Sequence, residues 1–116
     1  AESGFIEYIV VVRENHKHAG AIIVPDFTFL KQWCHKHEIK YTNPQEMINN
    51  NEVKKRYAEE VKKINQNFGD TEKIKCHVLI ADEWSVNNGI LTPTLKVKRK
   101  IVKEQYKDLI EKMYKD

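Results

Sequence analysis

The sequence predicts an α+β domain in which a small sheet of about three strands packs with three to four helices. Two β-branched runs near the N-terminus suit a hairpin, amphipathic stretches of helical period follow, and a later alternating segment supplies another strand. At 116 residues the chain has the length of one domain. It can bury a modest core without a disulfide or a metal.

The expected hairpin joins strands at residues 6–12 and 21–24 through the polar loop 13–20. Pro25 should end the second strand, because it cannot continue the backbone hydrogen bonding. Asp26 should then cap a helix by accepting hydrogen bonds from its first free amides.

Two helices should follow the hairpin. Four residues of the first recur at helical spacing and should face the core: Leu30, Trp33, Cys34 and His37. The second should start with Asn43 as N-cap, Pro44 at the first helical position and Glu46 completing a capping box.

A longer helix is expected after the polar break at residues 49–51. Its apolar positions recur at intervals of three and four and should end before Gly69: Val53, Tyr57, Val61, Ile64 and Phe68.

Residues 73–81 predict a third strand, with one buried face that joins the hairpin. The face expected inside carries Ile74, Cys76, Val78 and Ile80; the other carries Lys75, His77 and Leu79. One last helix should bury Val102, Tyr106, Leu109 and Met113.

The bulk composition sets limits on function. Twenty basic residues nearly offset seventeen acidic ones, so the net charge of +3 does not demand a polyanionic partner. Cys34 and Cys76 lack the spacing of a disulfide framework or metal motif, which indicates reduced, buried thiols in a cytoplasmic protein. There is no apolar run of the roughly 18–20 residues that span a bilayer and no targeting signal. The start at Ala1, without a methionine, suggests an excised domain.

The most informative segment is residues 87–99, which places Lys96 after a Thr-Pro-Thr turn between a predicted strand and a predicted helix. The side chain of a lysine on such a turn can reach a substrate, because it does not lie along a solvated helix face. Gly89, after two asparagines, should form a tight turn with positive φ. The plainer interpretation is that residues 96–100 are a solvated basic helix start.

The amino-acid sequence of this segment resembles a known family motif. Leu91-Thr-Pro-Thr-Leu-Lys96-Val-Lys-Arg-Lys100 is similar to the terminal motif of the adenylate-forming acyl-CoA synthetases. Most of that superfamily has glycine before the lysine, whereas Leu95 stands here, a variant common in long-chain fatty acid CoA ligases. Residues 5–12 and 21–33 resemble the segment that follows the domain hinge of these ligases. The resemblance covers nearly the whole chain.

The resemblance implies the C-terminal mobile domain of an ATP-dependent long-chain fatty acid CoA ligase, lacking the upstream hinge and large N-terminal domain. It implies Lys96 as the catalytic residue of acyl-adenylate formation and Lys96 with Thr94 as nucleotide-binding residues. The full enzyme would use ATP and Mg²⁺, with fatty acid and coenzyme A as further substrates. The partner of this domain would be the enzyme's own large domain. The isolated domain should bind no cofactor and be inactive, and peripheral membrane association of the full enzyme stays open.

A lysine suits this chemistry because both reactants are anions. A charge contact at about 4 Å and an effective dielectric near 20 is worth roughly 4 kcal/mol. That corresponds to about a thousandfold in rate.

Several of these residues also allow other interpretations. A small nucleic-acid-binding module could use the basic segment Lys96 to Lys107, but that segment lacks interleaved exposed aromatics, so no nucleic acid is expected. Thr94 could simply form the turn, and Arg99 is expected to pair with an acidic neighbour. Cys34, His35 and His37 suggest a metal site but supply too few ligands, so none is expected. Trp33 and Trp84 are expected to be core or edge aromatics.

Overall fold

The computed structural model describes residues 4–13 and 18–115 and has an α+β architecture, as the sequence predicts. Its elements follow the order β1 (Ile6–Val12), β2 (Ala19–Pro25), α1 (Phe27–Lys36), α2 (Pro44–Asn49), α3 (Asn51–Asn65), β3 (Ile74–Leu79), α4 (Arg99–Gln105) and α5 (Lys107–Lys115). Residues 14–17 of the predicted hairpin loop lie outside the described residues. No helix of the described part combines the length and apolar character that crossing a membrane requires.

The three strands form one mixed sheet in the order β1-β2-β3. β1 and β2 pair antiparallel as the predicted hairpin, and β3 pairs parallel with β2 after the crossover through α1, α2 and α3. β2 is longer than expected, because Ala19 and Gly20 already belong to it. A continuously apolar central strand is typical of a sheet covered on both faces.

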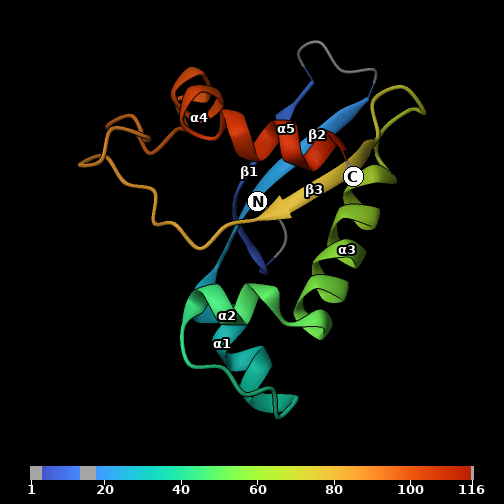
Figure 1. Ribbon diagram of the computed structural model, residues 1–116, viewed down its shortest axis with the longest axis vertical. Coiled ribbons are helices and arrows are strands. Elements are labelled where there is room, and N and C mark those ends of the chain that lie inside the picture. The colour runs from blue at the N-terminus through green and yellow to red at the C-terminus, as the bar shows by residue number, and fades with distance from the viewer. Residues whose placement is uncertain (1–3, 14–17, 116) are drawn as a thin grey trace.

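Helices do cover both faces (Figure 1). One core cluster joins Ala21 and Ile23 of β2 to buried residues of α1, α2 and α3. The other joins Ile22 and Val24 to α4, α5 and the segment between β3 and α4. β2 is therefore shared by two cores.

The N-termini of α1 and α2 are capped as predicted. The Phe29 N–H donates to Asp26 Oδ1 at 3.1 Å, and the Glu46 N–H donates to Asn43 Oδ1 at 2.8 Å. The predicted capping box is wrong in its other half, because the Glu46 carboxylate instead accepts a 2.6 Å hydrogen bond from the Thr42 hydroxyl. In α1, Leu30 and Cys34 are buried, Trp33 is half-buried and His37 is exposed, so the inward face is narrower than predicted.

The end of α3 was predicted wrongly. The helix stops at Asn65, and Phe68 lies beyond it with 37% of its surface exposed. The side chain of Asn65 turns to β3 instead: its amide donates to the Ile74 carbonyl at 2.9 Å and its oxygen accepts from the Ile74 N–H at 2.8 Å. The helix thus ends four residues before Gly69, and its last residue is bonded to β3.

β3 differs from the predicted strand, which was expected to bury only one face. His77 and Leu79 are half-buried on the α3 side, and Cys76 and Val78 are half-buried on the α5 side. Both faces are covered because α3 lies beside this edge strand while α5 crosses the opposite face (Figure 1).

The predicted last helix is two helices, which brings the described helices to five. The break falls at Tyr106, whose φ of −106° and ψ of 21° depart from helical values. Near the end of α5, the Tyr114 hydroxyl lies 3.0 Å from the Val12 carbonyl oxygen and 2.8 Å from that of His18. It thus bridges the two ends of the β1–β2 connection.

Candidate functional site: the Lys96 hairpin

Residues 90–98 form a small ordered hairpin, which we call the Lys96 hairpin. Leu91 and Val97 form an antiparallel bridge, and the Lys98 N–H donates to the Ile90 carbonyl at 2.8 Å. At the tip, the Leu95 N–H closes a turn onto the Thr92 carbonyl at 2.8 Å. The Thr92 N–H donates to the Lys96 carbonyl at 2.8 Å. The backbone at Lys96 is therefore held by hydrogen bonds within the hairpin.

Two threonine side chains add to the turn. The Lys96 N–H donates to the Thr92 hydroxyl oxygen at 3.1 Å, and the hydroxyls of Thr92 and Thr94 lie 3.1 Å apart. The Thr92 hydroxyl thus accepts from a backbone amide across the turn, and hydroxyl-to-backbone bonds are one reason why threonine suits turns. Thr94 thus has a structural role in the loop; its predicted contact with a nucleotide stays a prediction.

Leu95 has a φ of +65°, in the left-handed region that glycine enters freely. A three-residue hairpin loop commonly ends in such a residue after its β-turn. This explains why glycine precedes the lysine in most of the superfamily that the motif resembles. Gly89 also has the predicted positive φ, +84°.

The side chain of Lys96 is directed outward by its neighbours. Leu91 is buried and Val97 packs against the second core cluster, which fixes the register of this short extended segment. Since successive side chains of extended backbone alternate in direction, Lys96 faces away from the core. It is exposed, and its ammonium forms no ion pair with any residue that the structure describes.

Contrary to the prediction, Arg99 pairs with no acidic residue in the described part of the chain. Its guanidinium donates to the main-chain carbonyl of Val11 in β1. This contact attaches the start of α4, directly after the Lys96 hairpin, to the edge strand of the sheet. A carbonyl at a distant strand gives no local sequence signal.

A buried polar network supports the segment before the hairpin. The Trp84 indole N–H donates to the Tyr106 hydroxyl at 3.0 Å, and that hydroxyl donates to Asp82 Oδ2 at 2.6 Å. Burial and the bond to Asp82 raise the pKa of Tyr106 to about 12. The sequence marked Trp84 and Tyr106 as apolar positions, but their pairing depends on how the segment folds back onto α4 and α5.

The other predicted features have simpler roles. Trp84 is buried, whereas Trp33 is half-buried and stacks on His37 with ring centroids 4.4 Å apart. Cys34 and Cys76 are free thiols, Cys34 buried and Cys76 half-buried, and burial raises the pKa of both. Within residues 4–13 and 18–115 there is no cluster of three or more His, Cys, Asp or Glu residues that could hold a metal ion.

The basic segment Lys96 to Lys107 offers no stacking surface for nucleic-acid bases. Tyr106, its one aromatic residue, is 7% exposed and bonded to Trp84 and Asp82. Single-strand binders combine cations with exposed aromatics. Nothing in this geometry therefore favours the nucleic-acid interpretation.

No family model matches the chain. Curated relatives do: human long-chain-fatty-acid CoA ligase 6 is 35% identical over 95 residues, which are 80% of this chain and 14% of the relative. Peroxisomal long chain acyl-CoA synthetase 6 of Arabidopsis thaliana is 31% identical over 98 residues, 83% of this chain and 14% of the relative. The chain thus spans about one seventh of the length of these relatives.

A solved structure shares the fold. The adenylation and carrier-protein didomain of a carboxylic acid reductase from Segniliparus rugosus, solved with AMP, matches 97% of this chain and 14% of its own. The TM-score is 0.71 at 21% sequence identity. This likeness concerns the fold alone, whereas the curated relatives show the family and align through their C-terminal part. Over about four fifths of its length, the chain belongs to the long-chain-fatty-acid CoA ligases.

Proposed function

We propose that the chain is the C-terminal mobile domain of an ATP-dependent long-chain-fatty-acid CoA ligase. In this role Lys96 supplies a positive charge to acyl-adenylate formation, before the acyl group passes to coenzyme A. The observation that carries the proposal is the Lys96 hairpin: an exposed, unpaired ammonium on an ordered turn, in a chain that aligns with these ligases.

The reaction needs a cation because a carboxylate oxygen must attack the α-phosphorus of ATP, and both reactants are negative. A preorganised ammonium stabilises the charge that develops on the phosphate oxygens. The Thr92 and Thr94 hydroxyls hold the backbone next to Lys96, so little reorganisation is needed when the side chain reaches the substrate. Lysine suits this role as a compact charge on a flexible stem.

In this proposal the chain contributes the charge of Lys96 and, with Thr94, contacts to the nucleotide. Its described residues offer no cluster of carboxylates or histidines for a metal ion. Because the chain spans only 14% of the length of its relative, the remaining sites for ATP, Mg²⁺, fatty acid and coenzyme A belong, in this proposal, mainly to the enzyme's large domain. The 116-residue chain alone should be inactive.

The test is Lys96→Ala in the full enzyme, with the two half-reactions measured separately. Adenylate formation should slow by about two to three orders of magnitude, following the charge estimate. Thioester formation from preformed acyl-adenylate should stay within about twofold of wild type, since it does not need this charge at the phosphate.

Lys100→Ala is the matched control, because Lys100 is an exposed lysine in the first turn of α4. It should leave both half-reactions unchanged. Equal losses in both half-reactions, or an equal effect of Lys100→Ala, would contradict the role of Lys96. Acyl-CoA formation by the 116-residue chain supplied with ATP, Mg²⁺, fatty acid and coenzyme A would contradict the expected inactivity.

A further inference from the structure

A hollow of about 280 Å³ opens between the α2–α3 junction and the edge strand β3. It is lined by Ile48, Asn49, Lys54, His77, Val78 and Leu79. Val78 packs with the second core cluster, but the other lining residues lie on the α1–α3 side of the sheet or at its edge, whereas the Lys96 hairpin packs with the second cluster. The hollow is therefore separate from the Lys96 hairpin.

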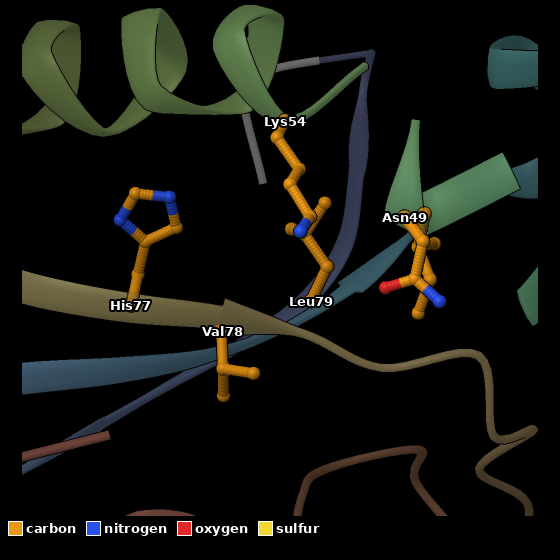
Figure 2. Close-up of a pocket in the computed structure, with 6 residues that line it drawn as sticks. Asn49, Lys54, His77, Val78 and Leu79 are labelled. Carbon is orange, nitrogen blue, oxygen red and sulfur yellow. The ribbon is translucent and has the colours of Figure 1, made fainter. Parts of the chain in front are cut away.

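The polar side chains of the hollow come from three elements. Figure 2 shows the His77 ring rising from β3 toward α3 and the Lys54 side chain extending from α3 toward β3. The Asn49 amide, from the end of α2, reaches the same space, while Val78 points to the other side of the strand.

The lining of the hollow carries a positive charge without an acidic partner. Lys54 lies in the first turn of α3, where the positive end of the helix dipole disfavours a cation. It forms no ion pair with any described residue. No acidic side chain lines the hollow. An anion would therefore offset a charge that the domain leaves uncompensated here.

The remaining lining groups suit a small oxyanion. Asn49 carries two amide donors, and the His77 ring is half-buried without a hydrogen-bond partner among the described residues. Burial lowers the pKa of His77, which favours the neutral ring, whose one N–H can donate. Ile48, which is buried, and Leu79, which is half-buried, supply the apolar part of the lining.

The helix amides are not free to take the anion. The Asn50 side chain already accepts from the Glu52 and Val53 N–H groups, at 2.8 and 3.2 Å. Recognition must therefore come from side chains.

We propose that this hollow binds a phosphate group, held by the Lys54 ammonium and the Asn49 amide with the His77 ring against it. The group is either inorganic phosphate or the phosphate of a small monoester. Exposed ion pairs contribute little, so binding should be weak, with a Kd of about 1–10 mM.

The test is an NMR titration of the 116-residue chain at fixed pH and constant ionic strength. Inorganic phosphate, glycerol phosphate and acetate are added separately. The two phosphates should give saturable shifts of the His77 ring and Asn49 amide signals, and acetate at the same ionic strength should give less than about a third of them. Saturation by inorganic phosphate alone supports the free anion, and saturation by glycerol phosphate as well supports the monoester.

Variants test the site itself. Lys54→Met and Asn49→Ala should each weaken phosphate binding about threefold or more. Lys55→Met is the matched control, because this exposed lysine is next on α3 and does not line the hollow, and it should change binding by less than about 1.5-fold. Shifts that do not saturate, equal shifts with acetate, or equal weakening by Lys55→Met would overturn the proposal. Each outcome is independent of the role of Lys96.

Discussion

Leu95 shows how one residue can carry a conformational cost at a site. Its φ of +65° places the Cβ atom close to the backbone, at a cost of about 1–2 kcal/mol for a residue other than glycine. Its side chain is 60% exposed and so recovers little by burial. The residue beside the proposed catalytic lysine is thus among the least favourable of the fold.

Leu95→Gly should therefore stabilise the chain. Relief of the left-handed conformation outweighs the greater backbone entropy of glycine in the unfolded state, for a net gain of about 0.5–1 kcal/mol in the free energy of unfolding. Urea denaturation checks this. Leu95→Ala is the control, because it removes the exposed side chain and keeps the strained φ, so its stability should stay near that of the wild type. A less stable glycine variant would show that Leu95 makes a compensating contact.

At the scale of elements, the local signals were predicted well and the long-range ones were missed. Asp26 and Asn43 cap their helices as expected, because a cap involves only residues two or three positions away. At the end of α3, the Asn65 side chain bonds Ile74, nine residues further on, in a strand that must already be in place. The spacing of apolar residues cannot predict that contact.

Asn65→Ala tests whether this side chain joins α3 to β3. The change leaves the Ile74 N–H and carbonyl without their partner, which should lower the free energy of unfolding by about 1–3 kcal/mol in urea. Gln66→Ala, an exposed neighbour, should cost less than about 0.5 kcal/mol. Asn65→Asp should fall between them, since it keeps the acceptor for the Ile74 N–H and loses the donor. Equal effects of Asn65→Ala and Gln66→Ala would refute the coupling.

At the scale of the whole molecule, the site was only partly predictable. Lys96 and its turn are contiguous in sequence, so the motif located them. The hollow gathers Asn49, Lys54 and His77 from three elements, and His77 was expected on the outer face of a one-sided strand. Both cores also depend on β2, because alternate residues of this strand face opposite sides. The domain should therefore unfold as one unit.

Tyr57→Phe tests whether the two cores unfold together. The Tyr57 hydroxyl in the first core donates a buried 2.6 Å hydrogen bond to the Phe5 carbonyl, and its loss should cost about 1–2 kcal/mol. In a Trp33→Phe background, fluorescence reports Trp84 in the second core. Its urea transition should shift as far as that of far-UV circular dichroism.

Tyr41→Phe makes the same substitution at a half-buried residue whose hydroxyl has no partner in the described part of the chain. It should shift neither transition by more than about 0.5 kcal/mol. A Trp84 transition that stays in place while circular dichroism shifts would show that the two cores unfold separately.

The bridge made by Tyr114 bears on how the domain is completed during synthesis. The β1–β2 connection leaves the ribosome about a hundred residues before the hydroxyl that joins its ends. Until α5 emerges, the cover over one face of the nascent sheet is incomplete, which leaves part of the core around Ile22 and Val24 open to chaperones and other chains. A translational pause just before α5 should therefore promote aggregation more than a pause after it.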